Sequence, residues 1–217
     1  MNARSSGLPP DTAFLLERLE KEGFMSRFTM VGGSALALQL GHRQSEDLDF
    51  MQDGEKIAPT GIKRFIAKTF PDYRLIREET GYQLDFLVHG VKLTFFSAGA
   101  ILIQFPVREF AFRSGKINIA PVSIIASLKL AAISQRCTMR DYYDLYYIAR
   151  HVMPLSEIYA NTRRLIPNLS PITYSETIIF TKDIPETEVS DHLLPKEIVT
   201  KDQIAAFFVE EIRKMQV

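Results

Sequence analysis

The stretch between Phe28 and Phe50 constrains the fold of this chain more than any other part of the sequence. Phe28–Val31 is expected to form a short buried strand that ends at a Gly-Gly pair. Strong helix formers follow over Ser34–Leu40, and another glycine ends that pattern. Leu48–Met51 then has the apolar character of a second strand. The segment therefore predicts a strand, a glycine turn, a short helix and a second strand in direct succession.

The remaining elements predict an α+β fold with a change of character near residue 120. Before it, we expect a helix after Asp11 that buries Phe14, Leu15 and Leu19, a helix over Gly61–Phe70, and strands over Tyr73–Arg77, Gln83–Val88, Val91–Phe96 and Ile117–Ile119. After it, helices are expected over Ser123–Arg136, Met139–His151 and Ser156–Leu165, with a last helix behind the capping box Thr200–Gln203. We therefore expect a mixed sheet flanked by helices over residues 1–120 and a mainly helical module over residues 121–217.

Composition narrows the class of protein. The 217 residues carry 26 Lys and Arg against 26 Asp and Glu, which excludes a uniformly basic nucleic-acid binder but leaves room for a local basic surface. Such a concentration occurs around Asp72, at Lys63, Arg64, Lys68, Arg74 and Arg77. The single cysteine, Cys137, cannot form an internal disulfide. The first ten residues contain no apolar run of the kind that a signal peptide needs, and no stretch of the chain approaches the length of a membrane span. A cytoplasmic protein with no membrane partner is expected.

Asp47 and Asp49 follow the glycine turn and are the strongest candidates for chemistry. Residues two apart in a strand share a face, so these carboxylates should project together while Leu48 enters the core. Their mutual repulsion would be relieved by a hard divalent cation such as Mg²⁺, which uses carboxylates together with substrate phosphates. Gly33 would let a phosphate approach the N–H groups of the following helix, and Ser34 adds a hydroxyl.

Each half of this pattern has an ordinary structural explanation. A Gly-Gly pair before a helix is commonly turn punctuation, and an Asp-x-Asp strand edge can be a solvated face. The two halves in this order and spacing indicate a combined metal and phosphate site. The four histidines and one cysteine have no spacing typical of zinc ligands, so any metal would be held by carboxylates.

These residues resemble a known family. The chain resembles the nucleotidyltransferase superfamily typified by DNA polymerase beta. The signature of that superfamily is Gly-Ser, a spacer of about a dozen residues, and then Asp-hydrophobic-Asp-hydrophobic. Three segments more narrowly resemble the AbiEii/AbiGii toxin family of nucleotidyltransferases. These segments are GGSALALQLGHRQSEDLDF and the later KLAAISQR and RDYYDLYYI. The resemblance implies a polymerase beta-like core whose active-site cleft is completed by the helical module. It also implies that Gly33 and Ser34 hold an NTP, and that Asp47 and Asp49 coordinate Mg²⁺ or Mn²⁺.

The superfamily usually adds a third carboxylate on a neighbouring strand. Asp85, in the hydrophobic-Asp-hydrophobic sequence Leu84–Phe86, is the natural candidate for a catalytic role. The paired strand carries Thr94 at an equally plausible position, and a threonine cannot act as the base or ligand. Both alternatives stay open from the sequence.

Further candidates lie in the helical region and in the loop before Asp47. Lys129 interrupts an apolar run and either snorkels to the surface or, as the resemblance implies, faces the nucleotide together with Arg136. Asp141 and Asp144 share a helix face, and one of them could pair with Lys129 or Arg136. The resemblance assigns the essential, catalytic acid to Asp141. Arg43 could reach a phosphate or be a solvated loop residue.

Together these features predict a Mg²⁺-dependent nucleotidyltransferase. It would move a nucleoside monophosphate from an NTP to an acceptor hydroxyl and release pyrophosphate. The resemblance implies the toxin of a toxin–antitoxin or phage abortive-infection system, with tRNA or another RNA as acceptor and a cognate antitoxin as partner. The same chemistry on a protein or a small molecule such as an antibiotic, or a degenerate nucleotide-binding module without activity, are the alternatives.

Overall fold

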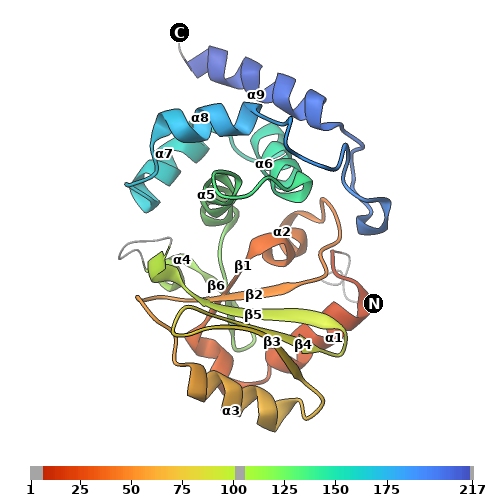
Figure 1. Cartoon of the computed structure of the whole chain (residues 1–217), viewed down its shortest axis with the longest axis vertical. Helices are drawn as coiled ribbons and strands as arrows, with labels where there is room; N and C mark the ends of the chain where they lie inside the picture. The colour runs from red at the N-terminus through yellow and green to blue at the C-terminus, as the bar shows by residue number, and fades with distance from the viewer. Residues whose placement is uncertain (1–6, 101–105, 216–217) are drawn as a thin grey trace. The chain divides into compact units, whose positions relative to one another are not determined.

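A computed structural model of the chain describes residues 7–100 and 106–215. The chain divides into two compact units (Figure 1). The first unit comprises residues 1–40 and 44–121, and the second comprises residues 41–43 and 122–217. The short segment 41–43 thus belongs to the second unit although both of its neighbours in the chain belong to the first.

The described part of the first unit contains a seven-stranded mixed sheet in the order β3-β4-β5-β2-β1-β7-β6. The strands are β1 (Thr29–Val31), β2 (Leu48–Gln52), β3 (Arg74–Glu79), β4 (Gln83–Val88), β5 (Val91–Ser97), β6 (Phe112–Ser114) and β7 (Ile117–Ile119). β2 runs antiparallel to β1 and parallel to β5, while β1 runs parallel to β7. The strand pair that carries the Asp-x-Asp sequence therefore lies in the interior of the sheet.

Helices cover both faces of this sheet (Figure 1). α2 (Gly32–Leu40) lies over one face, and α1 (Pro10–Leu19) and α3 (Pro59–Thr69) lie over the other. An aromatic cluster fills the core, in which the ring of Phe95 packs against those of Phe28, Phe50 and Phe86. Strand alternation then places Asp49, Thr94 and Asp85 on the face opposite these rings.

The prediction for α1 was wrong in two details. Phe14 is 53% exposed, and Leu16 is buried instead, together with Leu15 and Leu19. Leu15 and Leu19 are four residues apart and Leu16 adjoins them on the helix surface, whereas Phe14 falls to one side of this stripe. The residue before the helix is Pro9, and Asp11 lies in the first turn, where its charge favours the helix N-terminus.

The second unit is helical throughout its regular structure. Its helices are α5 (Val122–Ile133), α6 (Met139–His151), α7 (Leu155–Leu165), α8 (Pro171–Ile179) and α9 (Lys201–Met215). α5 packs against α6, α7 and α8, and α9 packs against α6, α7 and α8. Because α5 is surrounded by other helices, it is apolar on nearly every side, and Lys129 is a charged exception within it.

The fold class predicted from the sequence is confirmed: a mixed sheet flanked by helices precedes a run of helices. The capping box also forms, because the Thr200 hydroxyl accepts the Gln203 N–H at 3.2 Å and the Gln203 side chain accepts the Thr200 N–H at 2.9 Å. α5 ends at Ile133, so Arg136 lies in the connection to α6 and not in the helix as expected. No helix in the described ranges is both long and apolar enough to cross a membrane.

Candidate functional site

The glycine turn between β1 and α2 brings the backbone close to Asp49. Gly32 has a φ of +74°, a conformation that side chains disfavour. A Cβ atom at this position would lie 2.5 Å from Asp49 Oδ2, so the carboxylate occupies the space that a side chain would fill. Gly33 and Ser34 follow in the first turn of α2. Glycine at position 32 therefore serves both the turn and the approach of the carboxylate.

Ser34 has a different contact from the one expected of it. Its side chain is buried, and its hydroxyl donates a hydrogen bond to the backbone carbonyl of Asp47. This bond ties the first turn of α2 to the residue that precedes β2. Ser34 thereby fixes the backbone beneath the Asp47 side chain, and its hydroxyl is committed to that contact in this structure.

The two carboxylates of the Asp-x-Asp sequence project away from the core. Leu48 and Phe50 are fully buried, while Asp47 and Asp49 are half-buried, as strand alternation requires. The predicted burial of Leu48 and Phe50 is confirmed, and Asp47 lies just before β2 rather than within it. The described residues contain no group of three or more His, Cys, Asp or Glu side chains that could hold a metal by themselves. Two carboxylates beside a helix N-terminus do fit a hard divalent cation that completes its ligands with phosphate and water oxygens.

The sheet register places Thr94, rather than Asp85, beside Asp49. Asp49 on β2 is opposite Thr94 on β5, and Thr94 is in turn opposite Asp85 on β4. Asp85 therefore lies two strand spacings from Asp49, about 10 Å at the usual separation of strands. Its carboxylate accepts a hydrogen bond from Gln83 Nε2 at 2.8 Å and has Lys92 Nζ at 3.8 Å. The structure thus places Asp85 in the same row as Asp49, with a threonine between them.

A buried charge cluster in the second unit is organised around Asp144. Its carboxylate accepts hydrogen bonds from Arg43 Nε and Nη2 at 2.7 and 2.8 Å and lies 2.7 Å from His42 Nε2. Lys129 Nζ is 2.6 Å from the second oxygen. Burial alone would raise the pKa of Asp144, but the cations of Arg43 and Lys129 hold that pKa well below its ordinary value. Asp144 is therefore a carboxylate fully enclosed by its partners.

Asp141 forms the second half of this cluster. It accepts hydrogen bonds from Lys129 Nζ at 2.7 Å, from Arg136 Nε at 2.8 Å and from the Thr138 hydroxyl at 2.7 Å. Burial opposes charge on Lys129, but the carboxylates of Asp144 and Asp141 outweigh it and raise the lysine's pKa. Lys129 therefore remains an ammonium ion. The predicted pairing of Asp141 with Lys129 or Arg136 is confirmed for both cations.

Two of the structural explanations weighed for these cations were wrong. Lys129 is only 6% exposed and so does not snorkel to the surface. Arg43 is buried in its pair with Asp144 and is not a solvated loop residue. The pairing of Asp144 with Lys129 was among the alternatives, but its contact with His42 was missed because it joins segments about a hundred residues apart. The adjacent His42-Arg43 pair, followed far along the chain by two acids on one helix face, was the available signal.

The predicted basic surface around α3 is partly neutralised. Lys63 Nζ is 2.9 Å from Glu78, and Arg77 Nη2 is 2.9 Å from Glu79. Both acids lie at the end of β3, directly after Arg77 in the chain. These ion pairs reduce the net positive charge that this surface could offer to RNA.

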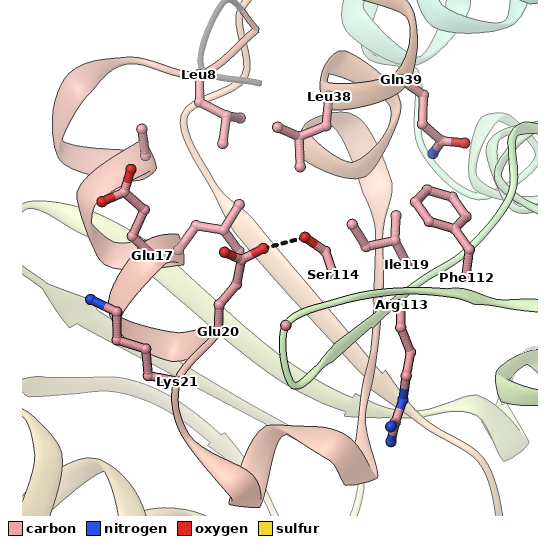
Figure 2. A pocket seen from close by; sticks show the side chains of 13 residues that line it. Leu8, Glu17, Glu20, Lys21, Leu38, Gln39, Phe112, Arg113, Ser114 and Ile119 are labelled. Atoms are coloured by element: carbon pink, nitrogen blue, oxygen red, sulfur yellow. Dashed lines mark hydrogen bonds between the residues drawn. The ribbon is translucent and has the colours of Figure 1, made fainter. Parts of the chain in front are cut away.

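A separate pocket of about 790 Å³ opens in the first unit (Figure 2). Its lining is mixed, with apolar side chains such as Leu38 and Phe112 beside the acids Glu17 and Glu20. The Ser114 hydroxyl donates a hydrogen bond of 2.5 Å to Glu20 (Figure 2). The Asp-x-Asp residues and Asp85 are not among the residues that line it. The pocket is thus distinct from the candidate metal site.

A protein-family model and a bacterial relative each match most of this chain. The family model described as nucleotidyl transferase AbiEii toxin, type IV toxin–antitoxin system, matches residues 14–167. An uncharacterized protein of Aquifex aeolicus, aq_aa25, is 29% identical over 205 residues, which are 92% of this chain and 93% of that protein.

Two crystal structures from Helicobacter pylori share the fold. A candidate nucleotidyltransferase superposes with a TM-score of 0.53 at 17% identity, covering 94% of this chain and 96% of the other. JHP933 superposes with a TM-score of 0.50 at 16% identity, covering 94% and 93%. At these identities the likeness supports a common fold and nothing finer.

Proposed function

Since the chain belongs to the AbiEii nucleotidyl transferase toxin family of type IV toxin–antitoxin systems, we propose that it transfers a nucleoside monophosphate from an NTP to a hydroxyl of an RNA acceptor. The acceptor oxygen forms a bond to the α-phosphorus, and the bond from that phosphorus to the bridging oxygen of the β-phosphate breaks. Pyrophosphate leaves, and the proton of the acceptor hydroxyl passes to solvent. The observation that carries this proposal is the placement of Asp47 and Asp49 beside the glycine turn that opens α2.

Asp47 and Asp49 would hold Mg²⁺ or Mn²⁺ in this reaction. When bound, such a cation neutralises the charge that develops on the phosphates during an in-line displacement. The contribution of the protein is to hold Asp49 on β2 and Asp47 in the residue directly before that strand. Gly32 lets Asp49 lie against the backbone, and the Ser34 hydroxyl fixes the carbonyl of Asp47. Both carboxylates are therefore positioned by α2 before substrate arrives.

The phosphates of the NTP require donors and positive charge. We propose that the N–H groups around Gly33 supply donors at the start of α2. Lys129, Arg43 and Arg136 are proposed to supply positive charge, and the raised pKa of Lys129 keeps that side chain protonated at neutral pH. Asp141 would then act through Lys129 and Arg136, since it pairs with both.

Asp85 lies on β4 and is separated from Asp49 by Thr94 of β5. It stands one strand beyond Thr94 and is engaged by Gln83 and Lys92. A direct role for Asp85 predicts that Asp85→Asn abolishes transfer as completely as Asp49→Asn does. Residual activity in Asp85→Asn would assign this acid to support of the sheet.

The family indicates the protein partner, and the acceptor is a further part of the proposal. Its members are toxins of type IV toxin–antitoxin systems, so an antitoxin is the expected protein partner. We propose tRNA or another RNA as acceptor, because RNA ends offer the hydroxyl that nucleotidyl transfer needs. A role in phage abortive infection is proposed on the same basis.

The test is a transfer assay with purified protein, Mg²⁺, total RNA and each NTP labelled in turn. Asp47→Asn and Asp49→Asn are expected to lose transfer, whereas Asp72→Asn, an exposed acid in the same unit, should retain it. Label that enters protein or a small molecule and not RNA would overturn the choice of acceptor. Absence of any label that depends on Asp47 and Asp49 would overturn the proposed activity.

A further inference from the structure

Thr94 has a buried hydroxyl that lacks a partner. The residue lies in β5, in the interior of the sheet, and is 5% exposed. Among the described residues, no atom forms a hydrogen bond with its Oγ1. A buried hydroxyl without a partner is destabilising, and most buried side-chain polar groups in proteins are satisfied. This position therefore calls for an explanation beyond packing.

Packing and strand propensity do not require a hydroxyl here. Valine has nearly the same shape, favours strands at least as well and has no polar atom to bury. By contrast, the buried hydroxyl of Thr12 in the same unit donates to the carbonyl of Glu46 at 2.8 Å. Thr94 and Thr12 are thus two buried threonines, of which only Thr12 uses its hydroxyl in a hydrogen bond within the described structure.

The neighbours of Thr94 identify what the hydroxyl can serve. Its register partners are Asp49 on one side and Asp85 on the other, each about 4.8 Å away across the sheet by ordinary strand spacing. Register partners point to the same face of a sheet, so all three side chains share one face. The Asp85 carboxylate already accepts a hydrogen bond from Gln83 Nε2 and forms an ion pair with Lys92. Asp49 is the proposed cation ligand, and ligand carboxylates are commonly oriented by a further hydrogen bond.

We propose that Thr94 is a positioning residue for Asp49. Its hydroxyl donates a hydrogen bond to the Asp49 carboxylate when that carboxylate turns to hold the divalent cation. The hydroxyl that lacks a partner in this structure gains one in the loaded site. This inference rests on the proposed function, because it assigns Asp49 to the cation.

The proposal also explains why a threonine is adequate beside Asp49. A hydroxyl cannot accept the acceptor's proton at neutral pH, so Thr94 does not replace a third acid. It can fix the orientation of a neighbouring ligand without adding negative charge. The site then holds its cation through two carboxylates, one of them oriented by the adjacent strand.

The test measures cation binding rather than transfer. Mn²⁺ is titrated into the full chain in the presence of each α,β-methylene NTP, and bound Mn²⁺ is followed by electron paramagnetic resonance. Loss of a supporting contact typically weakens metal binding about 10-fold or more, so Thr94→Val should show a loss of that size. Thr94→Ser keeps the hydroxyl and should bind Mn²⁺ as the wild type does.

Thermal unfolding without metal or nucleotide separates this role from a structural one. Thr94→Val should unfold no lower than the wild type, because the lost hydroxyl has no partner, whereas Thr12→Val should unfold at a lower temperature. Thr94→Val with wild-type Mn²⁺ affinity overturns the proposal, as does a lowered unfolding temperature that Thr94→Ser fails to restore. If Asp49→Asn also binds Mn²⁺ normally, the proposed metal site itself fails. If only Thr94→Val does so, the failure is confined to Thr94.

Discussion

Arg43 and Asp144 form a buried bidentate ion pair, with Nε to Oδ1 at 2.7 Å and Nη2 to Oδ2 at 2.8 Å. The two residues are 101 positions apart in the sequence. The pair attaches segment 41–43 to α6, and the Tyr143 hydroxyl of α6 also donates a hydrogen bond to the His42 carbonyl at 3.2 Å. A short loop next to the Asp-x-Asp motif in sequence is thus held by the second unit.

Asp144→Asn should be strongly destabilising. The substitution leaves Arg43 and Lys129 buried beside a neutral amide, and removing one partner of a buried ion pair typically costs about 3–5 kcal/mol. Urea denaturation followed by circular dichroism measures the free energy of unfolding. Asp72→Asn, at an exposed turn, is the control and should change it little. A cost for Asp144→Asn no larger than that of the control would show that the cluster does not stabilise the fold.

The contribution of Asp144 to the free energy of unfolding should be lost at low pH. The folded-state pKa of this carboxyl is well below that of the unfolded chain, so the unfolded state binds more protons as the pH falls. The stabilisation is complete above about pH 4, the ordinary pKa of aspartate, and is lost as the pH drops through the folded-state value. Urea midpoints measured across this range should converge for the wild type and Asp144→Asn. A difference that persists unchanged into strong acid would contradict the depressed pKa.

His42 should add a second pH dependence at milder acidity. Burial lowers its pKa, and this outweighs the opposing effect of Asp144, so the folded state disfavours protonation of the ring. Stability attributable to this residue is present above about pH 6.5 and declines as the pH falls below that value. His42→Gln keeps a donor but cannot titrate. Its free energy of unfolding should fall less than that of the wild type between about pH 7 and pH 5. Parallel curves for the two proteins would disprove this.

Gly32→Ala should damage both the fold and the site. The positive φ disfavours alanine, and the new Cβ would lie 2.5 Å from Asp49 Oδ2. A cost above about 1 kcal/mol and a loss of nucleotidyl transfer are expected. Gly61→Ala is the matched control, since Gly61 lies in α3 with open space around it and should gain about 0.5–1 kcal/mol. Transfer activity in Gly32→Ala equal to that in Gly61→Ala would show that the close approach of Asp49 is unimportant.

Local sequence patterns were sufficient for much of the fold. β4, β7 and α6 match their predicted bounds, because alternation, a glycine turn or helical periodicity marked each of them. β6 (Phe112–Ser114) and α8 (Pro171–Ile179) were missed. β6 has three residues, two of them exposed, and therefore has no alternation to detect. It is held by its pairing with β7, which only the folded sheet provides.

Part of the candidate site could likewise be predicted from the sequence, and part of it could not. The alternation around Asp49 could be predicted, since it depends only on strand geometry. The residue beside Asp49 on the adjacent strand could not be predicted, because the choice between Thr94 and Asp85 depends on the order and register of three strands. The sequence also did not reveal that Asp144 is the centre of the buried charge cluster, since its partners come from a loop and a helix far apart in the sequence.

Asp47 and Asp49 are proposed to support transfer of the nucleoside monophosphate, which carries the α-phosphate of the NTP. The most direct measurement compares the same NTP labelled at the α- or the γ-phosphate, with RNA as acceptor. The α-label should enter RNA, the γ-label should be released as pyrophosphate, and both processes should stop in Asp49→Asn. Transfer of γ-label to the acceptor, or α-label incorporation that survives in Asp49→Asn, would contradict this proposal.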